Sequence, residues 1–588
     1  MIDPFSQGAI LAQLLLAGLL TLIVGALLLV AYRRSVQRWM AVASGPGRAV
    51  ATARLAPPSA GGAFPALDLR LTSDTSWAGA FRSPTFLGAT AAMRRAAMIY
   101  ALAGFAHAAT ATVLQMLFGQ FEFLPIRASV VFWANAWPVV LTLMLLWGAD
   151  RRRQGLIIVI YFAVLAVFAG IVGLGPTPPL VLSSIPSLAT PAPGTQWMSE
   201  LAKGVVVPAF AQPLMFWVLL TLPTVYLLLF LNRRVRSIGP LLLVFMLIAA
   251  VGSHLATVAL SGWPELFASA AVATGTSAEL WVYGFPLFGM VVFAIPGWLI
   301  IRWIGRRYRR KQFSDQSFVF DGIWLFASLL LCQSLLSDAG YGGWAGLATF
   351  VAWKLVCRVG LAAVARRASE RPPAHLLLLR VFGFQRRTER LFSVLSARWR
   401  YAGPIQLIAA PDLATANIEP GELLDFVSGR LRNAFIKNEA ELGRRVAERD
   451  VRPDPDGRFR VNEFFCTGDT WQAAVIRLME GAHLVAMDLR GFTPANQGCV
   501  FEIETLVARV PAARIAFLVD ATTDLNLLRQ ILAGARADPS SSREVGDVAP
   551  RILRTAGTDR TVRALLHLAD EALIATPPAT SSPRPQPA

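Results

Sequence analysis

The stretch HLVAMDLRGFTPANQGCVFEIETLVAR, residues 483–509, decides the fold of the C-terminal part of the chain. Its first seven residues are an apolar run with one acid, which is typical of a strand buried on both faces of a parallel sheet. A polar loop with Gly491 and Pro494 follows, and from residue 498 apolar side chains recur at helical spacing. The stretch therefore predicts a strand, a loop and a helix in succession.

The same alternation runs through residues 374–575. Strands are expected at 376–382, 405–410, 461–466, 483–489, 513–520 and 551–556, and helices around Leu391–Trp399 and over 470–480, 498–509, 523–533 and 559–574. Because right-handed crossovers bring such units into one parallel sheet, we expect a flavodoxin-like α/β domain over 366–575. It carries an inserted helix near 421–449 and is followed by a Pro/Ser/Thr-rich tail, 576–588, that we expect to be disordered.

The N-terminal part of the chain predicts a polytopic membrane region. Of the 588 residues, 55 % are hydrophobic, which exceeds what an ordinary soluble enzyme contains. A bilayer core of about 30 Å requires about 20 apolar helical residues. The stretches that meet this are 8–31, 97–118, 128–148, 155–173, 213–231, 240–262, 280–303, 317–336 and 343–364. We therefore expect nine spans within residues 1–365, and a loosely ordered loop over the Ala/Gly/Ser/Pro-rich residues 40–95.

The distribution of basic residues predicts the orientation of these spans. Residues 1–365 contain 25 Lys and Arg, of which 21 lie after the first, third, fifth and seventh predicted spans or, for Arg302, at the very end of the seventh. Since basic residues accumulate on the cytoplasmic side, we expect the N-terminus outside the cell and the C-terminal domain in the cytoplasm. This predicts a multi-pass protein of the plasma (inner) membrane. It also explains the formal charge of +18 without nucleic acid as a partner.

Several other residue patterns limit the function. The four cysteines are too few and too scattered for a disulfide framework, and neither they nor the five histidines show a metal-ligand spacing. Within the predicted spans, Asp321 and Arg358 could meet as a structural salt bridge, while Lys354 and His254 could line a transport pathway or make ordinary polar contacts. No metal or other cofactor is expected.

Ligands of open parallel sheets bind at the carboxyl ends of the strands, where the strand order reverses. Two predicted loops qualify by this rule, 383–388 after the first strand and 489–498 after the third long strand. Arg490 and Asn496 line the second loop by their position. The helix that follows this loop carries Cys499 and, three residues later, Glu502.

These two β/α units resemble those of TIR (Toll/interleukin-1 receptor) domains, notably of membrane-anchored TIR-like proteins of prokaryotes. The resemblance rests on Phe382-Gly383-Phe384-Gln385-Arg386-Arg387-Thr388 after the first strand and on Cys499-Val500-Phe501-Glu502. In members that cleave NAD, a glutamate at this position is catalytic and the first loop helps to hold the nucleotide. The resemblance thus implies that Glu502 is catalytic and that Gly383, Phe384, Arg386 and Arg387 bind the nucleotide.

Helical geometry allows Glu502 such a role without requiring it. Cys499, Ile503 and Leu506 share one face of the predicted helix, and Glu502 and Glu504 lie on opposite sides of that stripe. Glu502 can therefore lie at the rim of the crevice and stabilise positive charge at an anomeric carbon. The plainer alternative is an acid near the start of a helix, where the helix dipole favours it by about 0.3–1 kcal/mol.

Three classes of function remain open from the sequence. The first is a membrane-anchored TIR-like signalling or defence protein, in which assembly of the cytoplasmic domains into a homo-oligomer creates an NAD glycohydrolase with NAD as substrate. The second is a receptor or sensor in the lipid bilayer that binds a nucleotide or a protein partner without turnover. The third is a transporter or channel with a cytoplasmic regulatory domain.

Overall fold

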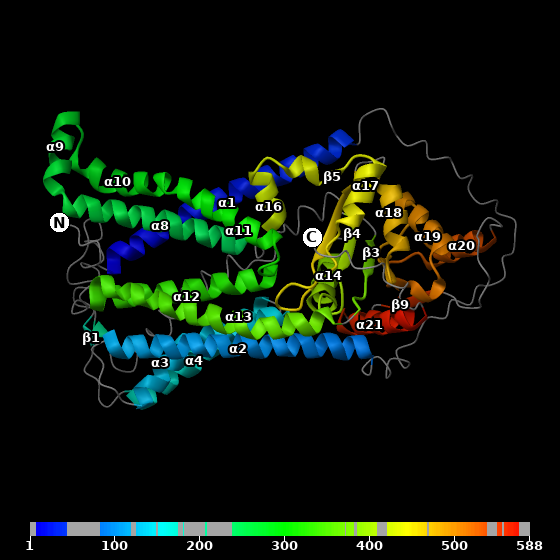
Figure 1. The fold of residues 1–588 in the computed structure, drawn as a ribbon, viewed down its shortest axis with the longest axis horizontal. Helices are drawn as coiled ribbons and strands as arrows, with labels where there is room; N and C mark the ends of the chain where they lie inside the picture. Colours follow the sequence, from blue (N-terminus) through cyan, green and yellow to red (C-terminus); the bar gives the residue numbers. More distant parts are fainter. Residues whose placement is uncertain are drawn as a thin grey trace, which may run out of the picture. The chain divides into compact units, whose positions relative to one another are not determined.

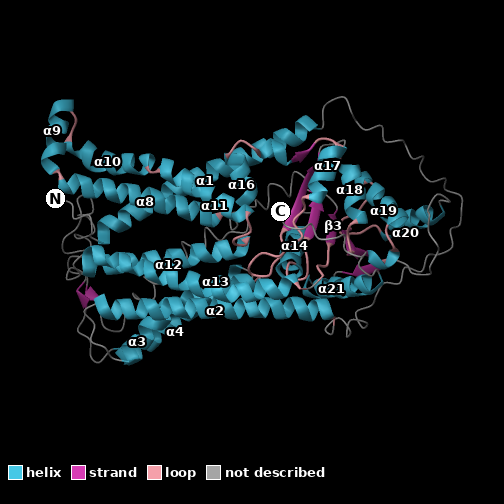
Figure 2. Cartoon of the chain, in the orientation of Figure 1, coloured by secondary structure: helices cyan, strands magenta, loops and turns pink. Residues whose placement is uncertain are grey.

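The computed structural model describes residues 7–43, 83–118, 125–148, 151–173, 180–181, 206–207, 238–370, 372–380, 385–408, 420–466, 470–537, 550–554 and 558–575. The chain divides into two compact units. The first, here the helical unit, contains Met1–Ala31, Ala97–Leu361 and Asn417–Leu424. The second, here the α/β unit, contains Tyr32–Ala96, Ala362–Ala416 and Asp425–Ala588. Figures 1 and 2 show the elements of both.

Long helices make up most of the N-terminal part of the chain. They are α1 (Gln7–Ala43), α2 (Pro84–Phe118), α3 (Pro125–Leu146), α4 (Arg151–Gly173), α8 (Gly239–Gly262), α9 (Pro264–Thr274), α10 (Ala278–Val292), α11 (Ala294–Arg309), α12 (Asp315–Ala339) and α13 (Leu347–Ser369). The 3₁₀ helix η4 (Gly340–Gly346) joins α12 to α13, and the strands β1 (Leu180–Val181) and β2 (Val206–Val207) pair antiparallel.

Seven helical stretches of the described residues are long and apolar enough to cross a membrane. They are Leu16–Trp39, Pro84–Phe118, Pro125–Leu146, Gly239–Gly262, Leu280–Arg309, Asp315–Leu336 and Gly340–Ala368. Each of them overlaps one of the nine predicted spans. The predicted span 155–173 forms α4, which is not among the seven, and the predicted span 213–231 lies outside the described residues. The chain is therefore a membrane protein with at least these seven apolar helices.

The predicted salt bridge between Asp321 and Arg358 is wrong. Asp321 Oδ2 instead lies 2.7 Å from Nζ of Lys354, and Trp353 Nε1 donates to Asp321 Oδ1 at 3.1 Å. Residues 353 and 354 lie one helical turn before Arg358, and this turn of α13 is the one that faces Asp321 of α12. The pair leaves no net charge at this point between the two helices.

The α/β unit is built on seven parallel strands. These are β3 (Leu376–Arg380), β4 (Ile405–Ile408), β5 (Phe435–Ile436), β6 (Val461–Cys466), β7 (Leu484–Asp488), β8 (Ile515–Val519) and β9 (Arg551–Arg554). Their order across the sheet is β5-β6-β4-β3-β7-β8-β9. All the predicted strands are confirmed, and Leu376 of β3 lies opposite Leu484 of β7, so the two strands that carry the predicted loops are neighbours.

Helices follow most of these strands, as the sequence predicts. They are α14 (Gln385–Trp399), α16 (Pro420–Val427), α17 (Glu439–Ala447), α18 (Trp471–Glu480), α19 (Gln497–Arg509), α20 (Leu525–Ala537) and α21 (Thr558–Ala575), with the 3₁₀ helices η5 (Leu431–Ala434) and η6 (Ala512–Arg514). The predicted disordered tail, 576–588, lies outside the described residues.

The single helix predicted near 421–449 is wrong. The chain leaves α16 through Gly429, whose φ of 72° is unfavourable for other residues, and then forms β5 at the edge of the sheet. Asn438 begins α17 by accepting a hydrogen bond from the Glu441 amide on its side chain, at 2.8 Å. The helical periodicity is real on both sides, but one left-handed glycine and one capping asparagine divide it.

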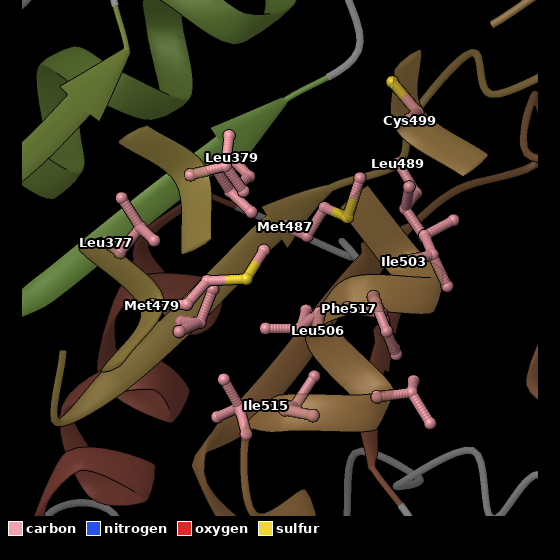
Figure 3. Packing of buried hydrophobic residues seen from close by; sticks show 14 of the residues in the cluster. Leu377, Leu379, Met479, Met487, Leu489, Cys499, Ile503, Leu506, Ile515 and Phe517 are labelled. Atoms are coloured by element: carbon pink, nitrogen blue, oxygen red, sulfur yellow. The ribbon is translucent and has the colours of Figure 1, made fainter. Parts of the chain in front are cut away.

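Two apolar layers cover the two faces of the sheet. Leu377 and Leu379 of β3 belong to one buried cluster together with residues of α18, α19 and α20, and Figure 3 shows this packing around Met487 and Ile503. Leu376 and Leu378 of β3 belong to the opposite cluster, with residues of α14 and α21. Both faces of β3 are therefore buried, as its unbroken run of leucines predicts.

The start of α2 belongs to the α/β unit and corrects the predicted loop 40–95. Ser83 and Thr85 donate their hydroxyl groups to the Asp570 carboxylate of α21, and the Thr85 amide also donates to it at 3.1 Å. Phe86 packs against the cluster of α14 and α21. Pro84 suits the first helical turn. A helix therefore begins 13 residues before the predicted span at 97, because a distant acid caps it. Residues 44–82 lie outside the described residues.

A cavity of about 570 Å³ lies beside this contact within the α/β unit. The first turns of α2 form one wall with small residues such as Gly88 and Ala92, and Asp570 and Leu573 of α21 form another. Tyr401, which precedes β4, also lines it. The cavity thus lies toward the amino ends of the strands.

Candidate functional site at the carboxyl ends of β3 and β7

The helices that follow β3 and β7 cover opposite faces of the sheet. α14 follows β3 and packs in the cluster that contains Leu376, whereas α19 follows β7 and packs in the cluster that contains Leu377. The strand order therefore reverses between β3 and β7, and the carboxyl ends of the strands at such a point are where open parallel sheets bind their ligands. This is the place that the sequence predicts for the site.

Glu502 of α19 is buried at this place. Its side chain is only 4 % exposed, and its Oε2 atom has no hydrogen-bond partner among the described residues. Burial raises the pKa of Glu502 to about 8, although the positive charge of Arg380 acts in the opposite direction. Glu502 lies deeper than the rim position that helical geometry alone suggests, and at neutral pH it holds a proton in most molecules.

Two further charged residues stand at the ends of these strands. Arg380 is the last residue of β3 and lies opposite Asp488, the last residue of β7. Both are buried, at 6 % and 2 % exposure. Neither residue is among the predicted site residues. The available signal was a lone charge at the end of each apolar run, LLLLR and LVAMD, because a charge inside a buried strand is rare unless it is paired.

The predicted binding residue Arg490 is held by Asp488. Its Nε donates to Asp488 Oδ1 at 2.7 Å, and its Nη2 donates to Oδ2 at 2.6 Å. Burial by itself lowers the pKa of Arg490, but the hydrogen bonds and the negative charge of Asp488 together raise it above its ordinary value. Two parallel hydrogen bonds fix the guanidinium plane, so Arg490 shapes the loop after β7 and has fewer N–H groups left for a ligand.

Asn496 closes the same loop. Its Oδ1 accepts hydrogen bonds from the Thr493 amide at 2.9 Å and from the Thr493 hydroxyl at 3.0 Å. Phe492 in this loop is fully buried, and Gly491 takes a φ of 77°. The loop after β7 is therefore anchored internally, and Asn496 precedes the first turn of α19 without capping it by its side chain.

Cys499 packs beside the acid. Its Sγ is 4.0 Å from the Arg380 carbonyl oxygen, and the residue is buried. Burial, and then the charge of Glu502, raises the pKa of Cys499 to about 12. The protonated thiol is a packing group here.

The other predicted residues are only partly described. Gly383 and Phe384 lie outside the described residues, and Arg386 and Arg387 lie in the first turn of α14 with side chains that are not described. Their helix begins at the carboxyl end of β3, the edge of the sheet that carries Glu502. The described residues contain no cluster of three His, Cys, Asp or Glu that could hold a metal ion.

Two aromatic rings cover the start of α19. Trp471 and Phe501 meet edge to face with ring centroids 5.4 Å apart. Trp471 packs against the core cluster of α18 and α19. Phe501, which the spacing places off the apolar stripe of α19, is half-buried against this ring.

The arrangement can bind a polar ligand in a dry environment. A protonated carboxyl group can donate to and accept from hydroxyl groups, and an ionised one can stabilise a cation where no water competes. Comparison of the chain with protein-family models, with curated proteins and with solved structures gave no match. The function is therefore inferred from these residues.

Proposed function

We propose that this chain is a membrane-anchored, TIR-like signalling or defence protein whose α/β unit binds a nucleotide and, on assembly, cleaves NAD through Glu502. The observation that carries the proposal is the buried carboxyl group of Glu502 at the point where the strand order reverses, beside Arg380. Acids are rarely buried without a partner, and perturbed groups in such a position favour a functional site.

The order of the strands supports the TIR-like assignment. When β5 and β6 are left out, the remaining strands β4-β3-β7-β8-β9 have the order 2-1-3-4-5, which is the flavodoxin-like order. β6 and β5 extend the sheet beyond β4, where the chain between β4 and β7 is long. The Cys499 to Glu502 spacing adds the local motif at the expected helix.

Cleavage of NAD requires Glu502 to be ionised, and binding of the substrate itself favours this ionisation. The pyridinium ring of NAD carries a positive charge, which lowers the pKa of a nearby carboxyl group. The Glu502 carboxylate then stabilises the charge that develops at the anomeric carbon as the C–N bond breaks. Nicotinamide leaves with the bonding electrons, water adds to that carbon, and a proton is released with ADP-ribose.

The helical unit supports a role beyond attachment. One apolar helix anchors a domain effectively irreversibly, and the described residues contain seven. We propose that the spans gather several copies of the chain and thereby bring their α/β units together at the cytoplasmic face of the inner membrane.

The test is NAD turnover by the purified full-length chain at high density in proteoliposomes. Nicotinamide release is measured for the parent chain, for Glu502→Gln and for Glu504→Gln. Glu504 is the matched control, because it lies on the same helix and undergoes the same substitution. We expect Glu502→Gln to lose at least about 100-fold in kcat and Glu504→Gln to stay within about threefold. Equal rates for the parent and Glu502→Gln would contradict catalysis at this position.

A receptor without turnover is the second candidate. The raised pKa of Glu502 favours it, because a neutral acid binds ribose hydroxyl groups without the charge that catalysis needs. In this case NAD binds to the parent chain, remains intact, and binds more weakly to Glu502→Ala.

A transporter with a regulatory domain is the third candidate. Polar groups inside the helical unit favour it, such as the chain of hydrogen bonds from His107 Nε2 to Ser328 Oγ, at 3.0 Å, and on to Thr349 Oγ1, at 2.7 Å. Solute flux into proteoliposomes that is lost in His107→Phe would support this candidate.

A further inference from the structure

A row of bases lies at the opposite end of the sheet from Glu502. His375, His483 and Arg514 each immediately precede a strand, namely β3, β7 and β8. These strands are adjacent and parallel, with Leu376 opposite Leu484 and Val485 opposite Ile515. Since neighbouring strands lie about 4.8 Å apart, the sheet places the three bases side by side at its amino end.

The two histidines are in direct contact. The His375 amide donates to Nδ1 of His483 at 3.0 Å, and the two rings meet edge to face with centroids 5.0 Å apart. An amide can only donate, so Nδ1 of His483 carries no proton and Nε2 of this ring is a donor. Nδ1 of His375 is buried and has no hydrogen-bond partner among the described residues.

Two arginines complete the row. The guanidinium of Arg514 donates to the carbonyl oxygens of Ala482 and His483, which fixes its position, and its other N–H groups have no hydrogen-bond partner among the described residues. Arg449 follows α17, and its Nη1 would lie 3.2 Å from a Cβ atom added at Gly481. Among the described residues no carboxylate pairs with Arg449. The nearby Glu480 instead lies 3.9 Å from Arg477 and 3.7 Å from Arg509.

The pKa values of all four bases in the row are lowered. Burial, then His483 and Arg449, lower the pKa of His375 to about 4. Burial, then Arg514 and Arg449, lower the pKa of His483, and burial lowers that of each arginine. Positive charge is thus unfavourable at all four groups, because burial opposes it and no carboxylate among the described residues pairs with them. An ordinary solvated patch would not combine half-buried arginines with a buried, unpartnered imidazole nitrogen.

We propose that Arg449, His483, His375 and Arg514 form a binding site for a phosphate group. A tetrahedral oxyanion offers several acceptor oxygens and up to two negative charges, which match two guanidinium groups, the Nε2 donor of His483 and a proton taken up on Nδ1 of His375. The site is separate from Glu502, since it lies at the other end of the strands.

The phosphate can come from a lipid headgroup or from a free phosphorylated compound. His375 follows the end of α13 at Ser369 by six residues, which span at most about 21 Å when extended. The site therefore lies within reach of the end of an apolar helix, where anionic headgroups would be found.

The test compares ligand-induced thermal stabilisation of the full-length chain in a neutral detergent. Inorganic phosphate is titrated in one arm, with chloride at equal ionic strength as a blank, and short-chain phosphatidylglycerol is titrated in the other, with short-chain phosphatidylcholine as a blank. The variants are Arg449→Gln and His483→Asn, which keeps an acceptor for the His375 amide. Arg444→Gln is the matched control, because Arg444 is an exposed arginine of α17.

We expect the parent chain and Arg444→Gln to bind the probe with Kd values within twofold of each other, and Arg449→Gln and His483→Asn to bind at least tenfold more weakly. Stabilisation by phosphate assigns a free phosphorylated ligand, and stabilisation by phosphatidylglycerol alone assigns a lipid headgroup. Absence of stabilisation by both probes, or equal stabilisation of all four proteins, would overturn the proposal.

Discussion

The two ends of the parallel sheet differ in the charged residues that they carry. At the carboxyl end, Arg380 and Arg490 accompany Asp488 and Glu502, so buried acids and bases are mixed. At the amino end, His375, His483, Arg449 and Arg514 gather without a carboxylate close to them among the described residues. At the carboxyl end the acids and bases balance one another within the unit, apart from the protonated Glu502. At the amino end the positive charge has no such partner among the described residues, and we propose that a bound phosphate group balances it.

The comparison shows why strand ends are the informative positions in this fold. The interiors of β3, β7 and β8 are apolar on both faces, so polar side chains occur in these strands only where they begin or end. The predictions that follow test whether the two ends differ as described.

The largest expected effect is at the carboxyl end, where Asp488→Asn removes the partner of Arg490. Loss of one member of a buried pair leaves an uncompensated charge and costs about 3–5 kcal/mol. Hydrogen exchange of the β3 and β7 amides in the full-length chain measures this loss of local stability. Glu480→Gln, which removes an exposed acid, is the control and should change the same amides by less than about 1 kcal/mol. Equal effects of the two substitutions would mean that Asp488 is not part of a desolvated pair.

The next effect is a pH-dependent gain of stability in Glu502→Gln. The folded pKa of Glu502, about 8, lies above its ordinary value of 4.5, so the folded state is favoured below pH 4.5 and loses this advantage as the pH rises to 8. Glutamine has no such dependence. We expect the two proteins to be equally stable near pH 4.5, and the variant to be more stable by a few kcal/mol at pH 8.

Thermal unfolding of both full-length proteins between pH 4.5 and 9 measures this gain. Glu504→Gln is the control for a half-buried acid of the same helix, whose pKa burial raises as well. A Glu502→Gln variant that is less stable at pH 8 would indicate an ionised, well-solvated Glu502.

A smaller effect is expected for Asp570→Ala, toward the amino end. This substitution removes the carboxylate that caps α2 and should cost about 0.5–2 kcal/mol. Faster hydrogen exchange is expected for the first turn of α2. Asp524→Ala is the control, since Asp524 Oδ1 accepts from the Leu527 amide at the start of α20. It should speed exchange in α20 and leave α2 unchanged.

The smallest effect is expected for Arg449→Gln without ligand. In phosphate-free buffer of low salt, removing one of several clustered positive charges should stabilise the chain by less than about 1 kcal/mol. The gain should vanish at 1 M salt, where the Debye length is about 3 Å. Arg444→Gln should show no comparable gain. A loss of stability in Arg449→Gln at low salt would mean that a carboxylate already balances Arg449.

Local patterns predict most of the α/β unit. The apolar runs give the strands, and the helix of Glu502 begins within one residue of its predicted start, because buried strands and amphipathic helices carry strong periodicity. The prediction of one helix over 421–449 is wrong because Gly429 and Asn438 interrupt it through backbone conformation and helix capping. Hydrophobic periodicity does not report either effect. The early start of α2 is not predicted because its cap, Asp570, lies 485 positions away along the chain from Thr85.

The candidate site is predicted only in part, because local patterns report position along a helix but not which strands are neighbours. Position along α19 identifies Glu502, but its depth and its neighbour Arg380 depend on which strands are adjacent. The row of bases at the amino end is equally hidden, because His375, His483 and Arg514 are far apart in the chain and meet only through the order of β3, β7 and β8.

The capping of α2 by Asp570 has a practical consequence for anyone who excises the domain. A fragment that starts at residue 366 would lack Ser83, Thr85 and Phe86, and so would expose the Asp570 carboxylate and an apolar hollow on α21. Such a fragment would tend to self-associate through this exposed surface and imitate the assembly that we propose for the full-length chain. Grafting residues 83–96 onto it would restore the missing turns and remove that artefact.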